Sequence, residues 1–121
     1  MTSLILFSCL LAFVQALLTV LLNTKNYFYL LSSRDEPIEV ATFVGRANRA
    51  HLNLMESLPI FLVLAVLSII IPEVDNYDLA MYWLGLRCVY VPLYVFNVTY
   101  IRSLVWGMSV ICLVLMAVSL M

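Results

Sequence analysis

Polar side chains recur at helical spacing where a strongly apolar segment begins. Steps of three, four and three residues place four of them on one face of a single helix, namely Arg46, Arg49, Asn53 and Glu56. A guanidinium group matches a carboxylate, an amide both donates and accepts, and a carboxylate accepts from an ammonium group. This helix face therefore suits a small zwitterionic ligand.

A second polar face follows further along the chain. Steps of four, three, four and three residues align Trp83, Arg87, Tyr90, Tyr94 and Asn97. An ionised side chain at the centre of a membrane helix costs about 2.5–3.5 kcal/mol, so such groups face the bundle interior and pair. We therefore expect Glu56 and Arg87 to form an ion pair. The polar groups left over after that pairing predict a ligand pocket that both helices line.

The composition indicates that transmembrane helices carry these two polar faces. Of 121 residues, 65% are hydrophobic and only 11% are charged, and the mean hydropathy of +1.10 excludes a soluble domain. At about 20 residues per crossing, one domain of this length holds four transmembrane helices. We expect them at residues 2–22, 50–71, 79–98 and 103–121. The predicted fold is an all-α integral membrane protein, a four-transmembrane-helix bundle.

Basic residues predict the orientation of the bundle. Lys25, Arg34, Arg46 and Arg49 fall between or beside the first two helices, and Arg102 precedes the fourth. Loops that carry Lys and Arg stay cytoplasmic. We therefore expect a multi-pass protein with both termini non-cytoplasmic and the polar pocket near the cytoplasmic face. The first helix is expected to be permanent, because a signal peptide would begin with basic residues.

The cysteines indicate neither a disulfide nor a metal site. Cys9, Cys88 and Cys112 fall in three different predicted helices, with no ligand-like spacing, so we interpret them as small buried hydrophobic residues. We expect no metal and no nucleic-acid partner.

Four stretches together resemble one protein family. The run GRANRAHLNLMESLPIF at residues 45–61 is similar to the signature of the MAPEG family, the membrane-associated proteins in eicosanoid and glutathione metabolism. RDEP at 34–37, RCVYVPLY at 87–94 and RSLVW at 102–106 fit the same family in the same order. The pattern is most similar to the small bacterial-type members.

The resemblance implies an assembly and a reaction. It implies a left-handed four-helix bundle that forms a homotrimer, with glutathione as co-substrate bound between adjacent subunits. The implied activity is that of a membrane-bound glutathione-dependent transferase or peroxidase. Such an enzyme joins the glutathione thiolate to a lipophilic electrophile from the bilayer, so its expected partners are membrane lipid and a lipophilic small molecule.

The resemblance also implies a role for each matching residue. Arg102 is the expected catalytic residue, because it matches an arginine that stabilises the thiolate. The residues expected to bind glutathione are Arg49, Asn53, Glu56, Arg87, Tyr90 and Tyr94. His51 lies off the polar stripe, so a cap or interfacial hydrogen bond is favoured over a catalytic base.

The sequence leaves two other classes of protein to consider. The first is a non-catalytic lipid-binding or scaffold member of the same family, which would gain nothing from keeping the whole polar set. The second is a small four-helix drug exporter, which needs an acidic residue in its first helix. That helix offers only Gln15, so the exporter is disfavoured.

Overall fold

Four helices make up the part of the chain that the computed structural model describes, residues 1–23 and 41–121. They are α1 (Thr2–Leu22), α3 (Thr42–Ile70), α4 (Tyr77–Val95) and α5 (Thr99–Ser119). The fold is therefore all-helical, as the composition predicts. Lys25 and the RDEP stretch at 34–37 lie outside the described residues, so the structure does not bear on them.

The second, third and fourth helices each differ at both ends from the sequence-based expectation. The second helix begins at Thr42 rather than near residue 50, because no proline or turn signal interrupts the polar run and the helix extends through it. It stops at Ile70, since Pro72 disfavours helical geometry at Ile71. The third helix ends at Val95 and the fourth starts at Thr99. Asn97 between them has φ of 61°, a conformation that asparagine tolerates better than most residues.

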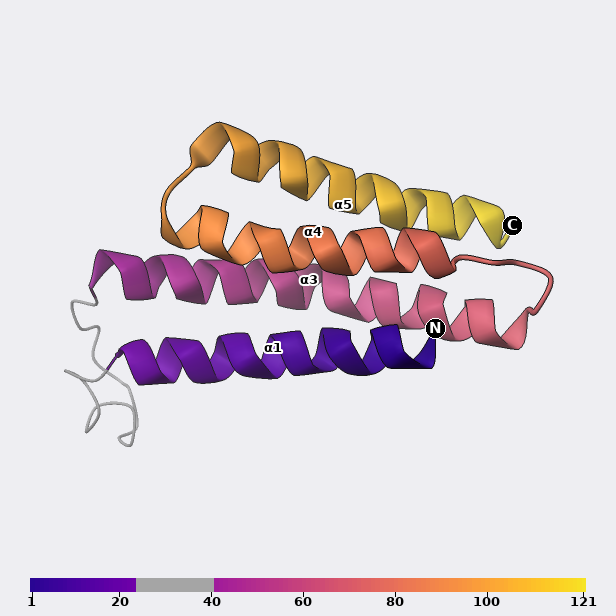
Figure 1. The fold of residues 1–121 in the computed structure, drawn as a ribbon, viewed down its shortest axis with the longest axis horizontal. Coiled ribbons are helices and arrows are strands. Elements are labelled where there is room, and N and C mark those ends of the chain that lie inside the picture. The colour runs from indigo at the N-terminus through magenta and orange to yellow at the C-terminus, as the bar shows by residue number, and fades with distance from the viewer. Residues whose placement is uncertain (24–40) are drawn as a thin grey trace.

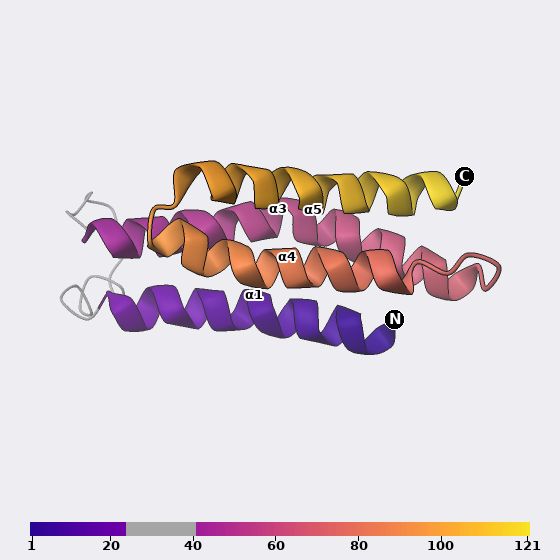
Figure 2. The same cartoon turned by 45° about the horizontal axis from the view of Figure 1, so that its top comes forward.

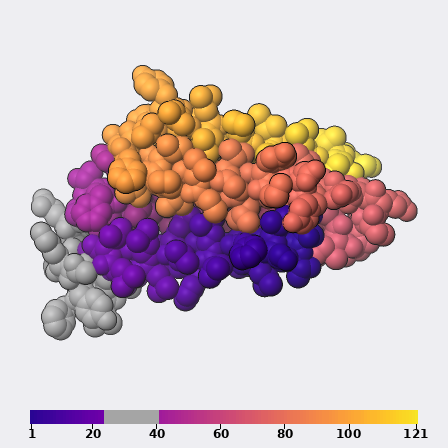
Figure 3. All heavy atoms as spheres, viewed as in Figure 1, coloured from indigo at the N-terminus to yellow at the C-terminus, as the bar shows by residue number. Residues whose placement is uncertain are grey.

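Each helix runs antiparallel to the next one along the chain, and both termini lie at the same end of the bundle (Figure 1). α4 and α5 form the most extensive helix pair, α1 packs mainly on α3, and α3 packs on α4. α3 and α5 meet only sparsely. Figure 2 shows α1 and α5 on opposite sides of the bundle, and on the face seen in Figure 3 α1 and α4 lie in front of the middle of α3. α3 and α4 therefore form the middle of the molecule.

Three of the described helices are long and apolar enough to cross a membrane, namely α1, α3 and α5. α4 falls short of that criterion because its 19 residues include Asp78, Arg87 and several tyrosines. It nevertheless runs the length of the bundle from the end of α3 back to the start of α5 (Figure 1). Arg87 and Tyr90 of α4 are buried against its neighbours, whereas Tyr77, Asp78 and Tyr82 in its first part are exposed.

Aromatic stacking and small residues pack the core. The rings of Phe61 on α3 and Trp83 on α4 lie parallel, with centroids 4.0 Å apart and an interplanar angle of 6°, and both side chains are fully buried. Ala12, Ala65 and Ala80 are also buried and allow the backbones to approach closely. The large apolar side chains that remain exposed are those a lipid-facing surface requires.

A polar cluster joins three helices at the end that carries the termini. The Asn76 amide, 2% exposed, donates from Nδ2 to the Ser68 hydroxyl at 2.9 Å and to the Met116 carbonyl at 3.3 Å. The Ser119 hydroxyl donates to Asn76 Oδ1 at 2.7 Å. We call these four residues the Asn76 clip. It ties the end of α3 and the start of α4 to the end of α5.

Candidate functional site

Among the described residues, Arg87 is the cation that is buried in the bundle, only 2% exposed. Its Nη1 donates to Oδ1 of Asn53 on α3 at 2.7 Å. Its guanidinium carbon lies 5.7 Å from the ring centroids of both Trp83 and Tyr90, within the range of cation–π attraction. An amide oxygen and two aromatic faces thus replace part of the hydration that burial removes.

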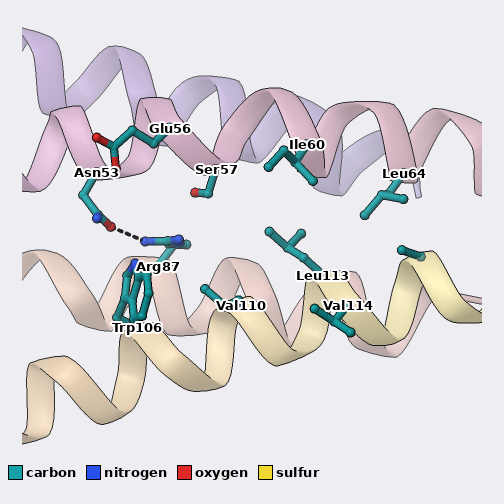
Figure 4. A pocket seen from close by; sticks show the side chains of 11 residues that line it. Asn53, Glu56, Ser57, Ile60, Leu64, Arg87, Trp106, Val110, Leu113 and Val114 are labelled. Carbon is teal, nitrogen blue, oxygen red and sulfur yellow. Dashed lines mark hydrogen bonds between the residues drawn. The ribbon is translucent and has the colours of Figure 1, made fainter.

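The prediction that Glu56 and Arg87 form an ion pair is wrong. Within the described residues the two side chains form no ion pair, and the guanidinium bonds to Asn53 instead. Figure 4 shows the Glu56 carboxylate turned away from Arg87, while Asn53, one turn earlier, reaches across to it. Helical spacing shows that Asn53 and Glu56 lie on the same side of α3. It does not show which of the two contacts Arg87.

A polar pocket lies beside this contact, with a volume of about 420 Å³. The Arg102 guanidinium carbon sits 4.4 Å from the centroid of the Tyr94 ring, and the Tyr90 and Tyr94 rings are 5.5 Å apart at an angle of 55°. The lining residues are Asn53, Tyr90, Tyr94, Arg102, Ser103, Trp106 and Gly107. The pocket therefore offers a cation, two phenols and an amide in one small space.

An apolar groove adjoins the pocket between α3 and α5, with a volume of about 370 Å³. We call it the α3–α5 groove. Figure 4 shows aliphatic side chains of α3 facing those of α5 across it. Its lining consists of Asn53, Glu56, Ser57, Ile60, Leu64, Arg87, Trp106, Val110, Leu113, Val114 and Ala117. Asn53 and Trp106 line both spaces, so the pocket and the groove meet at these two side chains.

The structure brings most of the expected site residues together. Four of them line the polar pocket, namely Asn53, Tyr90, Tyr94 and Arg102. Glu56 and Arg87 line the adjoining groove. Arg49 is exposed and lines neither space; its Nη1 lies back along α3, 3.6 Å from where a Cβ on Gly45 would be. The single chain thus brings six of the seven expected residues together and leaves Arg49 outside both spaces.

Comparison with known proteins identifies the family to which the chain belongs. A model of the MAPEG family matches residues 1–121, the whole chain. The chain belongs to the MAPEG family. No curated protein and no solved structure matches it. MAPEG membership, together with the three long apolar helices, makes this a membrane protein of a family that serves glutathione-dependent transfer, peroxide reduction or eicosanoid metabolism.

Sequence reasoning missed several residues that line the two spaces, Trp106 among them. Trp106 lies one helical turn after Arg102 and lines both the pocket and the groove. The four-residue spacing was a usable signal, because residues i and i+4 share a helix face.

Arg46 and His51, both on α3, also have defined surroundings. Nη1 of Arg46 donates to the Val95 carbonyl at 3.5 Å, where it meets the carbonyl end of α4. Nδ1 of His51 is buried without a hydrogen-bond partner among the described residues. His51 lines neither the polar pocket nor the α3–α5 groove, so the geometry gives no support to a role as catalytic base.

Proposed function

We propose that this MAPEG protein is a membrane-bound glutathione-dependent transferase or peroxidase, which joins the glutathione thiolate to a lipophilic electrophile from the bilayer. The observation that carries the proposal is the junction at Asn53 and Trp106 of a polar pocket and an apolar groove. A water-soluble thiol and a lipid-soluble electrophile need such a junction in order to meet.

Arg102 has the chemistry to activate the thiol. A free thiol has a pKa of about 8.5 and is mostly protonated at neutral pH, and a nearby cation lowers that pKa. Arg102 is held against the face of Tyr94, which fixes the position of its guanidinium. In the transferase reaction the proton of the thiol leaves to water, the sulfur attacks a carbon electrophile, and the leaving group departs as the carbon–sulfur bond forms. Proximity and thiolate stabilisation together supply the rate.

Other residues would hold the glutathione backbone. Asn53 can donate to a peptide carbonyl while its oxygen remains bonded to Arg87. The Tyr90 and Tyr94 hydroxyls donate to carboxylates. Arg87 contributes indirectly, since it orients Asn53, and Glu56 would accept from the ammonium group of glutathione.

We further propose a homotrimer whose sites are shared by adjacent subunits. Glu56 and Arg49 are exposed on the single chain, and charged side chains next to lipid are costly unless a partner or water covers them. A neighbouring subunit would cover both residues and complete the glutathione site. Because basic residues stay on the cytoplasmic side, the end of the bundle that carries Arg46, Arg49 and Arg102 would face the cytoplasm, and the polar pocket would open there.

The second candidate is a lipid-binding or scaffold member of the family without catalysis. The observation that favours it is the α3–α5 groove, since a mostly aliphatic lining suffices to hold a lipid. Such a role does not explain why Arg102, Tyr90 and Tyr94 surround a polar pocket beside that groove.

Calorimetric titration of the detergent-solubilised protein with glutathione tests the proposal. We expect saturable binding, weakened in Tyr94→Leu and retained in Arg46→Leu, a control arginine that lines neither the pocket nor the groove. Titration with a glutathione analogue that lacks sulfur separates binding of the peptide from contact with the thiol. If neither ligand gives a binding signal, the scaffold role replaces the enzymatic one.

A further inference from the structure

Three helices each carry a buried polar atom that has no hydrogen-bond partner among the described residues. These atoms are Oε1 of Gln15 on α1, Nδ1 of His51 on α3 and Nε of Arg87 on α4. Gln15 is 4% exposed and Arg87 is 2% exposed. The bond from Arg87 to Asn53 in Figure 4 uses Nη1 and leaves the Nε–H without a partner. Because nearly all buried polar groups bond to protein or to ordered water, these three atoms require an explanation.

The three residues lie at one level of the bundle, which we call the polar layer. Each of them lies one helical turn from a different member of the buried apolar cluster, namely Ala12 on α1, Leu54 on α3 and Trp83 on α4. The step leads toward the end opposite the termini in every case, because α1 and α4 run toward that end and α3 runs away from it (Figure 1). The polar layer, Gln15, His51 and Arg87, therefore covers the apolar cluster where α1, α3 and α4 meet.

Two further observations bring the same helices to this level. Val14 and Cys88 line one hollow between α1 and α4, and each is adjacent in the chain to a member of the polar layer. Asn53, which accepts a hydrogen bond from Arg87, comes two positions after His51. The members of the polar layer on all three helices therefore lie at the same depth.

The three atoms match the bonding capacity of one water molecule. Nε of Arg87 donates and Oε1 of Gln15 accepts, and Nδ1 of His51 accepts when the ring proton is on Nε2. A water oxygen accepts from the donor while its two hydrogens bond to the two acceptors, which gives the three bonds typical of a buried water. Trp83 Nε1, which is also buried without a partner among the described residues, is a second donor one turn from Arg87. A metal ion does not suit the polar layer, because the Arg87 guanidinium would repel it.

We propose that the polar layer binds one internal water, through which His51 positions the glutathione site. The water bonds to Nε of Arg87, Nη1 of Arg87 bonds to Asn53, and Asn53 lines the polar pocket. His51 is thus a positioning residue that acts through the water and Arg87 without touching glutathione. The water site itself does not require glutathione, whereas its effect on glutathione rests on the proposed function.

The sign of a stability change tests the water. If the Gln15 amide had no partner, Gln15→Leu would remove an uncompensated buried polar group and raise the Tm. If it shares a water, the leucine displaces that water, leaves His51 and Arg87 unsatisfied and lowers the Tm. We expect the lower Tm in detergent. The control is Ser8→Ala, because Ser8 is buried on the same face of α1 and its hydroxyl bonds to Ile5 within its own helix. An unchanged or higher Tm for Gln15→Leu would overturn the water site.

Nuclear magnetic resonance detects the shared water directly. His51 is the only histidine of the chain, so labelling histidine with ¹⁵N reports on this ring alone. At mildly alkaline pH, where an imidazole is neutral, the Nδ1 resonance should be that of an unprotonated, hydrogen-bonded nitrogen without any glutathione present. Gln15→Leu should shift it toward the value of a nitrogen without a bond, and Ser8→Ala should leave it in place. A resonance that Gln15→Leu does not move would show that the two residues share no water.

Kinetics tests the positioning role. His51→Leu and Gln15→Leu should each raise the KM for glutathione several-fold and leave kcat at saturation little changed, because a less fixed Asn53 weakens binding alone. His51→Asn places an amide oxygen where Nδ1 lies and should restore the KM. His51→Gln places its amide near Nε2 instead and should not. A fall in kcat alone, or rescue by Gln and not by Asn, would overturn the positioning role. Absence of glutathione binding by the parent, with the resonance shift intact, would overturn only the proposed function.

Discussion

The guanidinium of Arg102 lies 4.4 Å from the centroid of the Tyr94 ring. The contact joins the start of α5 to the last turn of α4 across a turn of only three residues. It gives the cation a fixed position before any ligand arrives, and a preorganised charge stabilises a developing anion without further reorganisation. The guanidinium is therefore already in place for the proposed thiolate chemistry.

Replacing Arg102 should shift the titration of the thiol of bound glutathione. Arg102 stabilises the charged form of the bound thiol, so Arg102→Leu should raise the pKa of glutathione in the site and move the thiolate absorbance curve to higher pH. A rise of about one pKa unit would lower the thiolate fraction, and with it the rate at neutral pH, about tenfold. Ultraviolet absorbance followed against pH measures this. Arg46→Leu is the control, and curves that coincide for Arg102→Leu and the parent would remove Arg102 from the mechanism.

Tyr94 should act through its ring more than through its hydroxyl in holding Arg102. Tyr94→Phe keeps the face on which the guanidinium rests, whereas Tyr94→Leu removes it, at a cost of about 0.5–2 kcal/mol for a cation–π contact. We expect kcat with a model electrophile to fall several-fold further in the leucine variant. If the two variants were equally impaired, the hydroxyl rather than the ring would be the functional group.

Stability should depend on Asn53 more than on Glu56. Asn53→Ala leaves the buried Arg87 guanidinium without its acceptor, which costs about 1.5–3 kcal/mol for a hydrogen bond to a charged group. Glu56→Ala removes an exposed carboxylate that forms no ion pair with Arg87. Thermal unfolding in detergent should therefore show a lower Tm for Asn53→Ala and a nearly unchanged Tm for Glu56→Ala. A lower Tm for Glu56→Ala than for Asn53→Ala would indicate instead that the ion pair between Glu56 and Arg87 is the main contact of Arg87.

The assembly should be three copies. The mass of the detergent-solubilised particle, corrected for bound detergent, should equal that of three chains. Glu56→Lys should weaken the assembly, because it reverses a charge that a neighbour is proposed to cover. A monomeric parent protein that still binds glutathione would show that one chain completes the site.

Composition predicted the all-helical fold, and periodicity placed Asn53, Tyr90 and Tyr94 on helix faces that line the polar pocket. Arg102 lies outside both polar stripes, and its role was expected from the family resemblance. The partner of Arg87 was not predictable, since spacing does not give the depth or rotamer of a side chain. The Asn76 clip was equally hidden, because Ser68 and Ser119 come near Asn76 only through the antiparallel packing.

Because α3 is longer than a typical bilayer core is thick, we expect the position of its first turns to depend on bilayer thickness. Its 29 residues span about 43 Å, some 13 Å more than a typical hydrocarbon core of about 30 Å. The first turns, which carry Arg46 and Arg49, must therefore stand among the headgroups or be drawn inward as the helix tilts. Such a mismatch costs fractions of a kcal/mol per ångström. A thicker membrane would bring the polar mouth of the site closer to hydrocarbon, so reconstitution in lipids of graded chain length should tune how readily a water-borne ligand enters.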